Sequence, residues 1–487
     1  MPRIAIIGGG AAGAAVVAQF LRDAAGEERC ADRALTWIVG DRAPGRGVAY
    51  ETADEQHLLN VRAANMGLFA DRPGDFLDYA AARGIAASGG QFLPRAIYGD
   101  YLEATLARLL ATARRRVTLA ARSTEAIAIR PRADAGFSIH TRDGEEIRAD
   151  GVVLALGALP PASLPGVDAA AAASGAYAAD AWRWPDLARA PGHVLVIGSG
   201  LTGVDTLLSA AARWPQARLT AVSRRGRWPA LHSDQPLAPY ADPAALIARL
   251  RERSHLGHWL RTIRAAAGAP DADWRAVLDA VRTETPRLWQ SLDARQRARF
   301  LRHLRPSWET VRHRMPPQTA AKLRALQDEG RLRLLAARVR GIEVDATTAD
   351  GGAGERGTPR LLARLQPRGD ARERTLAADF VIQATGLESA AASTPHALVR
   401  QLVDDGVAGA DPLGLGLAAR TDGRLLRPDG RPWPGLYALG TLLRGAVWEC
   451  TGLPEIRAAA RDIARELPTA LANADAAASS ERCVATA

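Results

Sequence analysis

The sequence predicts an α/β protein built from two Rossmann-like dinucleotide-binding domains with a helical insertion. Two of the three observations behind this prediction are glycine-rich loops at residues 8–13 and 198–203, each following an apolar strand-like run and preceding a helix-like run. The third is that this alternation stops after the second loop, where a helical pattern broken by prolines occupies about 228–322. Alternating strands and helices are typical of a parallel sheet covered by helices.

Each loop carries the pattern Gly-x-Gly-x-x-Gly. We expect Gly8 to make the tight turn, Gly10 to let the backbone approach a pyrophosphate, and Gly13 to let the helix pack closely on the strand. The helix N-terminus then offers free N–H groups to the anion. The second loop repeats the pattern with Gly198, Gly200 and Gly203. This repetition favours two nucleotide sites; the alternative is one site and one glycine-rich turn.

The positive charge of the chain comes almost entirely from arginine. The 487 residues carry a net charge of +10, and Lys322 is the one lysine. A chain of this length is expected to divide into two or three domains. Because the arginines are spread along the chain without a separate basic block, we expect anionic small ligands and no nucleic-acid partner.

The cysteines and apolar runs predict a cytoplasmic protein without a metal site or a membrane span. The three cysteines form no C-x-x-C pair, so neither a zinc ribbon nor a redox-active dithiol is expected, and free cysteines fit a reducing cytoplasm. Glycines interrupt the N-terminal apolar run, and no uncharged apolar run is long enough to cross a bilayer. His255 and His258 lack an accompanying pattern of acidic ligands.

We predict four segments along the chain, with the two chain ends sharing one domain. The strand-like run ending at Gly440 resembles the terminal block of flavoproteins with two dinucleotide-binding domains. This resemblance implies that the run returns to the first domain and acts together with the first loop on FAD. The segments are 1–165 (FAD-binding domain, first part), 190–375 (NAD(P)-binding domain with the insertion at about 228–322), 376–467 (return segment of the FAD-binding domain) and 468–487 (a flexible polar tail).

The side chains after the second strand of each unit bear on the nucleotide bound. Asp41 ends the first of these strands, where an acid in this fold binds the ribose hydroxyls of an adenosine; alternatively, it caps a turn. Arg224 and Arg225 stand at the corresponding place in the second unit. Arginines there suit a 2′-phosphate and favour NADPH over NADH, unless they are simply solvated.

Two blocks are more distinctive than the glycine motifs. The first is Gly45-Arg-Gly-Val-Ala-Tyr50 followed by His57-Leu-Leu-Asn-Val, and the second is Arg444-Gly-Ala-Val-Trp-Glu449 followed by Leu453-Pro-Glu-Ile-Arg457. These blocks resemble the flavoprotein family that includes FAD-dependent urate hydroxylases and the aspartate N-monooxygenase of nitrosuccinate synthesis. The resemblance extends in blocks from residue 4 to about 467.

This resemblance implies an FAD-dependent monooxygenase that uses NADH or NADPH and O2 on a small-molecule substrate. The closest family activity is the hydroxylation of urate to 5-hydroxyisourate, and a flat anionic purine suits an arginine-rich pocket. The alternatives are N-hydroxylation of an amino acid or amine, and a non-oxygenating NAD(P)H-dependent flavin reductase. The oligomeric state does not follow from the sequence.

The sequence and the resemblance together predict the site residues. For FAD they are Gly8, Gly10, Gly13, Asp41, Tyr50, Asn60, Gly440, Thr441 and Pro454; for NAD(P) they are Gly198, Gly200, Gly203, Arg224 and Arg225. The family usually has an aspartate where Thr441 stands, so we assign no carboxylate to the ribityl chain. The helix starting near Pro454 would offer N–H groups to the flavin pyrimidine.

Candidate catalytic residues come from the two distinctive blocks. We place His57, Asn60 and Arg62 against the flavin, with Trp448 and Glu449 at the opposite edge of its pocket; His57, Arg62 and Glu449 are the catalytic candidates. The alternative is that all five shape the pocket without touching the substrate. A further run at 305–316 is dense in groups that could bind an anionic or polar substrate, or it is a helix with a basic face.

Overall fold

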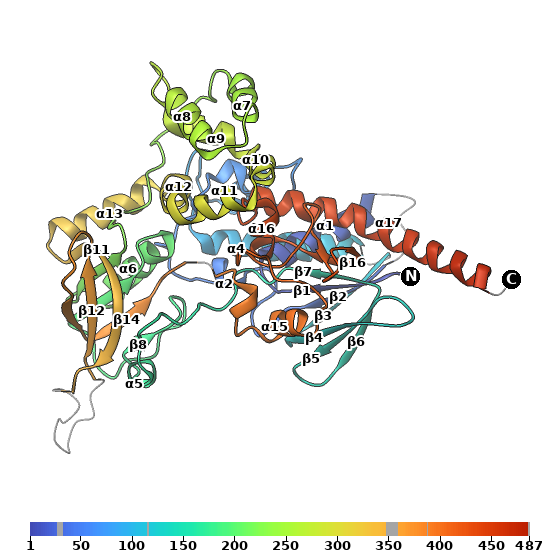
Figure 1. The fold of residues 1–487 in the computed structure, drawn as a ribbon, viewed down its shortest axis with the longest axis horizontal. Coiled ribbons are helices and arrows are strands. Elements are labelled where there is room, and N and C mark those ends of the chain that lie inside the picture. Colours follow the sequence, from blue (N-terminus) through green and yellow to red (C-terminus); the bar gives the residue numbers. More distant parts are fainter. Residues whose placement is uncertain (27–32, 114–115, 347–358, 387, 486–487) are drawn as a thin grey trace.

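Two parallel sheets lie side by side, and a group of helices caps the junction between them (Figure 1). The computed structural model describes residues 1–26, 33–113, 116–346, 359–386 and 388–485. The predicted fold class is confirmed, because both sheets have glycine loops followed by helices at their centres.

The first sheet combines both ends of the chain. Its order is β15-β16-β7-β1-β2-β3, parallel except for the antiparallel β15–β16 pair. The strands are β1 (Arg3–Ile7), β2 (Arg33–Ile38), β3 (Val117–Arg122), β7 (Gly151–Leu154), β15 (Arg424–Leu426) and β16 (Pro432–Ala438).

Each face of the first sheet buries a separate hydrophobic core. Ile4 and Ile6 of β1 face helices α1 (Ala11–Gly26), α4 (Arg95–Ala113) and α17 (Leu453–Ala485). Ala5 and Ile7 face the small antiparallel sheet of β4 (Ala126–Pro131), β5 (Phe137–Thr141) and β6 (Glu146–Ala149), together with α15 (Ala397–Asp404). Alternate residues of one strand therefore serve two cores, as the period of a strand requires.

The second sheet has the order β13-β12-β11-β10-β9-β14-β8. Its parallel strands are β8 (Tyr177–Ala178), β9 (His193–Ile197), β10 (Arg218–Ser223), β11 (Leu332–Val344) and β14 (Phe380–Gln383), and β12 (Leu361–Pro367) and β13 (Arg374–Ala378) extend it in antiparallel fashion. Helix α6 (Leu201–Arg213) follows β9 as α1 follows β1. The neighbours β14-β9-β10-β11 thus repeat β7-β1-β2-β3.

The helical insertion is smaller than the sequence suggests. Helix α13 (Pro317–Asp328) contacts α6 and β11, so it belongs to the second sheet as the crossover helix before β11. The helices that rise above the sheets in Figure 1 are α7 (Pro243–Arg251), α8 (Leu256–Ala267), α9 (Trp274–Arg282), α10 (Thr285–Ser291), α11 (Ala294–Arg299), the π-helix η2 (Phe300–Leu304) and α12 (Arg305–Arg312).

Two predicted segment boundaries differ from the structure. Strand β14 lies within the predicted return segment 376–467, yet it pairs with β9 in the second sheet. Strand β8 joins the same sheet before the predicted start at 190. The physical reason is that β9, which precedes the glycine loop, needs a neighbouring strand on each side. Strand β14 is one of these neighbours and corresponds to β7 beside β1 in the first sheet.

The chain after 467 also differs from the expected flexible tail. Helix α17 runs through Pro468 and continues beyond it. Leu467 is fully buried, and Leu471 packs against the same core, where both lie beside Gly151. Apolar residues at i and i+4 fall on one helix face, which holds this part of the helix on the sheet.

Helix α6 of the second unit is bonded directly to the first. Arg95 Nη2 lies 2.6 Å from Asp205 Oδ2, with both side chains largely buried. His57 Nε2 lies 2.8 Å from Ser209 Oγ, and that hydroxyl donates to Asp54. These contacts fix α6 against the loops that precede α4.

We expect Asp205→Asn to lower the free energy of unfolding by roughly 3 kcal/mol, because it leaves the Arg95 guanidinium buried without its carboxylate. The control is Asp186→Asn, which breaks the exposed ion pair that Arg213 of α6 makes with Asp186 and should cost less than about 1 kcal/mol. Urea unfolding measures both. Equal losses would show that the buried pair contributes no more than an exposed one.

Candidate cofactor and substrate site

The first glycine loop is shaped by close contacts that only glycine allows. Gly8 has φ +123°, and a Cβ there would lie 2.2 Å from the carbonyl oxygen of Ala155, just after β7. A Cβ on Gly13 would lie 2.1 Å from the carbonyl oxygen of Gly8, which also accepts a hydrogen bond from Trp37 Nε1. The loop therefore turns sharply between β1 and α1, as a pyrophosphate site needs.

The first distinctive block packs on this loop. The Gly45 N–H donates to the carbonyl of Gly9 at 2.7 Å, and a Cβ on Gly47 would lie 2.8 Å from the Gly10 Cα. Helix α2 (Gly47–Tyr50) follows, and the Tyr50 ring packs on that of Tyr98 with centroids 4.6 Å apart. The small residues of the block are explained by this close approach.

The second glycine loop has the same backbone and a more open mouth. Gly198 has φ +130°, and a Cβ there would lie 2.0 Å from the carbonyl oxygen of Ala384. A Cβ on Gly203 would lie 2.4 Å from the Gly198 carbonyl oxygen. Gly200 caps α6 and has no atom within 4 Å of its Cβ position, so the N-terminus of α6 has room for a ligand.

Asp41 follows β2 of the first sheet, and Arg224 and Arg225 follow β10 at the corresponding place in the second sheet. Asp41 is exposed, with Arg183 Nη2 3.7 Å away. Arg224 is also exposed, whereas Arg225 Nη1 donates to Ser307 Oγ of α12 at 2.7 Å. Asp41 and Arg224 thus have side chains free to meet ribose or phosphate groups, but Arg225 is engaged by the insertion.

The predicted flavin contacts His57, Asn60 and Arg62 have partners in the second unit. His57 Nδ1 lies 2.8 Å from Thr52 Oγ1, so both ring nitrogens are occupied. The main-chain carbonyl of Asn60 accepts a hydrogen bond from His232 Nε2 at 3.0 Å. Arg62 donates to carbonyl oxygens of Gly90, Ser233 and Gln235. These residues build the junction, and a flavin contact for them stays a prediction.

The C-terminal block meets the same region. After β16 the chain turns at Gly440 (φ +74°), and Thr441 lies buried in the 3-10 helix η4 (Gly440–Leu443). Helix α17 then begins at Leu453, with Pro454 in its first turn. Its Glu455 makes a two-pronged ion pair with Arg282 of α9, with both N–O distances 2.7 Å. The start of α17 is therefore fastened to the insertion.

Trp448 occupies a strained turn between α16 (Arg444–Val447) and α17. Its φ is +56° and its ψ is −66°, and the Glu449 N–H donates to the Val447 carbonyl at 2.7 Å. This is a γ-turn of the rare, positive-φ kind, which costs on the order of 1–3 kcal/mol for a residue with a bulky side chain. The buried indole packs against Trp289 and Phe300, with ring centroids 5.0 Å away in each case.

The turn brings Glu449 against helix α12. Glu449 Oε1 accepts from Trp308 Nε1 at 2.9 Å, and Oε2 lies 3.3 Å from Arg312 Nε. Trp308 and Arg312 are four residues apart and so share one face of α12. Within the part of the chain that the structure describes, the Arg312 guanidinium makes this ion pair but no hydrogen bond, and its Nε is buried without a hydrogen-bond partner.

Charged side chains of both signs gather around Glu449, with more arginines than carboxylates. The arginines are Arg282, Arg305, Arg312, Arg314, Arg444 and Arg457, and the carboxylates are Asp279, Glu309, Glu449 and Glu455. Arg314, Arg444 and Glu449 are buried, whereas Asp279 is exposed. Burial is the main cause that lowers the pKa of Arg312 and of Arg457, and Arg457 donates to the carbonyl oxygens of Asn65 and Gly67. An excess of partly buried cations favours an anion at this place.

Several residues of the junction carry no motif that reveals them in the sequence. Asp205 lies inside an apolar helix, and its only signal is a carboxylate on a helix face that is otherwise buried. Arg95 stands outside the two distinctive blocks, and the sequence does not show that it pairs with Asp205. Arg312 is part of the run at 305–316, and the structure distinguishes it from the other arginines of that run as the one that pairs with Glu449.

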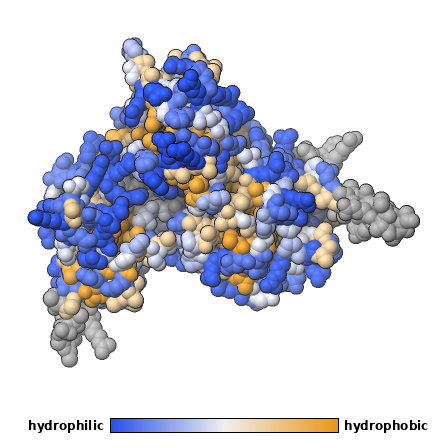
Figure 2. Space-filling view, in the orientation of Figure 1, coloured by the Kyte–Doolittle hydropathy of each residue, from blue (hydrophilic) through white to orange (hydrophobic). Residues whose placement is uncertain are grey.

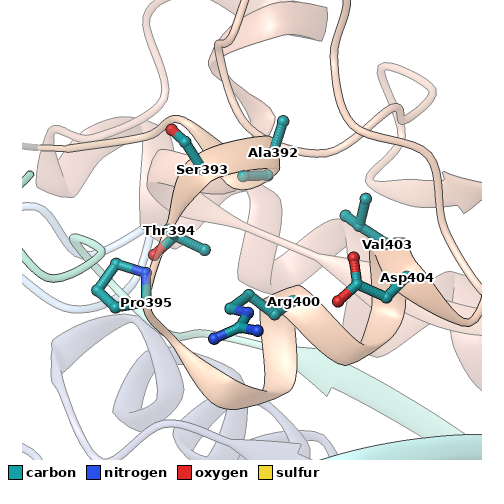
Figure 3. Close-up of a pocket in the computed structure, with 8 residues that line it drawn as sticks. Ala392, Ser393, Thr394, Pro395, Arg400, Val403 and Asp404 are labelled. Atoms are coloured by element: carbon teal, nitrogen blue, oxygen red, sulfur yellow. The ribbon is translucent and has the colours of Figure 1, made fainter.

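A surface pocket of about 390 Å³ lies elsewhere, between η3 (Ala391–Ser393) and α15 (Figure 3). Arg400 and Asp404 of α15 line it together with Thr394 and Pro395, and none of the predicted site residues does.

Over the described ranges, no three His, Cys, Asp or Glu side chains gather as metal ligands would. Within the same ranges, none of the helices combines the length and apolar character needed to cross a bilayer. Hydrophilic residues cover most of the face shown in Figure 2.

Comparison with known proteins supports a nucleotide-binding fold. Residues 5–159 match the profile of a family described as FAD-NAD(P)-binding. The chain therefore carries an FAD/NAD(P)-binding domain, in agreement with the predicted cofactors. Comparison with curated protein sequences gives no match.

Solved structures resemble the chain over nearly its whole length. Ornithine hydroxylase from Pseudomonas aeruginosa is 16% identical with a TM-score of 0.62, and the match covers 97% of this chain and 100% of that one. L-lysine 6-monooxygenase from Pseudomonas syringae is 18% identical with a TM-score of 0.63, and the match covers 96% of this chain and 100% of that one. Ornithine N-hydroxylase from Kutzneria sp. 744 was solved with reduced FAD, NADP+ and L-ornithine. It is 15% identical with a TM-score of 0.61, and the match covers 98% of this chain and 100% of that one. At such identities the likeness establishes a shared fold.

We expect Gly8→Ala to abolish FAD binding and to lower the free energy of unfolding by about 3 kcal/mol or more, because the new methyl group would overlap the Ala155 carbonyl at a positive φ. The control Gly430→Ala has φ +80° but no atom within 4 Å of the added carbon, so it should cost about 1 kcal/mol. Flavin absorbance of the purified variants and urea unfolding test this. Full FAD content in Gly8→Ala would contradict it.

We expect acid to weaken the fold through His232. Burial first, and the nearby Arg314 second, lower its pKa from 6.5 to about 4. The unfolded chain therefore binds a proton at a higher pH than the folded one, so this contribution to stability is present above pH 6.5 and is lost as the pH falls towards 4. When the pH falls from about 7 to about 5, the free energy of unfolding should decrease in the parent by on the order of 1 kcal/mol more than in His232→Gln. His303→Gln, at an exposed histidine, should follow the parent.

Proposed function

We propose that this protein is an FAD-dependent monooxygenase that uses NAD(P)H and O2 to N-hydroxylate an amino acid or another amine. The observation that carries the proposal is the pair of matching glycine loops, after β1 and β9, with the junction between their sheets closed by the helical insertion and the start of α17. The solved structures with this fold include hydroxylases of ornithine and lysine, one of them solved with reduced FAD, NADP+ and the amino acid.

The residues present fit both cofactors. At Gly8 and Gly198 a side chain would overlap the next strand, so both loops are kept free of side chains where a pyrophosphate approaches. The loop at 8–13, with Asp41 and the start of α17, would hold FAD, and the loop at 198–203, with Arg224, would hold NAD(P). When bound, the nicotinamide supplies a hydride to the flavin, and the reduced flavin supplies the electrons that activate O2.

The protein's own contribution is then to place the groups and exclude water. The bonds between α6 and the segments at 52–57 and 95 set the separation of the two nucleotide sites. N–H groups at the start of α17 would face the pyrimidine edge of a bound flavin, where negative charge develops on reduction. The insertion covers the junction and supplies the charged side chains around Glu449.

Urate hydroxylation is the second candidate. It is supported by the resemblance of the blocks at 45–66 and 443–457 to urate hydroxylases and by the excess of arginine around Glu449, which suits a flat anion. A reductase that passes electrons through a dithiol is disfavoured, because the sequence has no C-x-x-C and Cys450 is buried. A reductase acting directly on a quinone or protein remains a separate outcome of the assay.

The test is oxidation of NADH and NADPH by the FAD-loaded protein in air, with L-ornithine, L-lysine, L-aspartate or urate added in turn. An N-hydroxylase accelerates nucleotide oxidation with an amine and yields a hydroxylamine that contains oxygen from labelled O2. Loss of urate in step with the nucleotide would instead establish the second candidate. Nucleotide oxidation that gives only peroxide, or none with any of these compounds, would contradict the proposed substrates.

Arg224→Gln provides a test of the nicotinamide nucleotide. If Arg224 binds the 2′-phosphate, its loss should raise the KM for NADPH about tenfold or more and leave the KM for NADH nearly unchanged, since a charge-assisted hydrogen bond is removed from one nucleotide alone. Steady-state kinetics with both nucleotides measure this. Equal effects on the two would place Arg224 outside the 2′-phosphate site. Arg227→Gln, at an exposed position nearby, is the control.

A further inference from the structure

Arg312 has the least complete set of partners among the charged groups around Glu449. A guanidinium has five N–H donors, and buried donors are nearly always satisfied. Arg282 beside it has two short bonds to Glu455, and Arg444 donates to Glu309. Arg312 is 12% exposed and has an ion pair with Glu449 at 3.3 Å, without a hydrogen bond among the described residues. Because Nε is buried beside Glu449, the two Nη groups are the donors left for a ligand.

The ligand that fits Arg312 is a planar oxyanion. A guanidinium presents parallel N–H groups whose spacing matches the two oxygens of a carboxylate. The charged groups around Glu449 include more arginines than carboxylates, so an added anion would reduce the excess positive charge rather than increase it. Arg312 comes from the insertion and not from either nucleotide-binding sheet, which makes it a residue for the substrate more than for a cofactor.

The strained turn at Trp448 explains how Glu449 reaches α12. The positive-φ γ-turn reverses the chain within three residues, between the end of α16 and Glu449. The indole of Trp448 is held by Trp289 and Phe300 and lies 4.7 Å from the Arg444 guanidinium, so the side chain can keep the backbone in this conformation. Glu449 is then fixed at both oxygens, by Trp308 and by Arg312.

We propose that Arg312 receives the carboxylate, or an equivalent planar oxyanion, of the substrate, and that the γ-turn at Trp448 aims Glu449 so that it holds the Arg312 guanidinium in place. Arg312 is then a specificity-determining residue, and Trp448 and Glu449 are positioning residues. This proposal rests on the proposed function, because it identifies the group by which that site selects its substrate.

The first experiment measures binding without turnover. The tryptophan fluorescence of the FAD-loaded protein, in which Trp308 lies one helical turn from Arg312, is titrated with acetate, benzoate, L-aspartate, L-ornithine and urate. We expect at least one of these anions to bind saturably to the parent and to Arg299→Gln, which alters an exposed arginine of the insertion. Its Kd should rise tenfold to a hundredfold in Arg312→Gln, as the loss of charge-assisted bonds implies.

Results that contradict the role of Arg312 can be told apart from results that contradict the proposed monooxygenase activity. If none of the five anions binds, or if the one that binds does so equally well in Arg312→Gln, the assignment of Arg312 is overturned whether or not the protein hydroxylates anything. If Arg312→Gln instead raises the Kd of FAD, then Arg312 serves the flavin. Binding of an anion through Arg312 without any labelled product would uphold the assignment while the monooxygenase proposal fails.

The second experiment isolates the turn. Trp448→Gly and Trp448→Ala both remove the indole, but glycine adopts a positive φ without strain and alanine does not. Both variants should weaken anion binding, because both remove the indole that holds the turn, and we expect the Kd to rise about tenfold more in Trp448→Ala than in Trp448→Gly. Equal values for the two would overturn the role of the turn. Glu449→Gln keeps the size of the side chain and should weaken anion binding less than Arg312→Gln if Glu449 acts through Arg312; an equal or larger effect would place Glu449 itself on the ligand.

Discussion

The close contact between each glycine loop and the carbonyl group at the end of a neighbouring strand is the constraint on which the structure depends. Gly8 meets Ala155 after β7, and Gly198 meets Ala384 after β14. Each contact requires a strand on the far side of the loop-bearing strand, and the chain must travel a long way to supply it: β14 comes after the whole insertion, and β7 after the small antiparallel sheet. The interleaved order of segments follows from this requirement.

The sequence was sufficient for the parts of the fold that depend on local patterns. Three glycines at fixed spacing after an apolar run specify a turn whose geometry tolerates no side chain, so both loops and the helices after them could be predicted. The boundaries of the units could not, because the run at 380–383 is equally suited to either sheet. Its place beside β9 is decided by long-range packing.

The candidate site shows the same limit. The blocks at 45–50 and 444–449 stand out in the sequence, but what they touch is set by residues far away: Gly47 packs on Gly10, and Glu449 meets Trp308. His57 and Arg62 lie in a conspicuous polar loop and are predicted flavin contacts, and that contact stays a prediction. Their hydrogen bonds to Ser209 and Ser233 of the second unit could not be predicted from the loop itself. In the sequence Arg312 is one arginine among many; its ion pair with Glu449 and its lack of hydrogen bonds within the described chain distinguish it.

Helix α6 has one more consequence. Its first turn bears Gly200 at the mouth of the second loop, and its body bears the two groups, Asp205 and Ser209, that are bonded to the first unit. The bonded groups lie roughly 8–14 Å along the axis from that mouth, at about 1.5 Å per residue. A helix this short behaves as a rigid rod, so any tilt of the second unit about these bonds swings the loop through an arc. The accuracy with which a nicotinamide meets a flavin is therefore governed by a few polar side chains midway along one helix, and substitutions there can alter electron transfer while both nucleotide pockets remain intact.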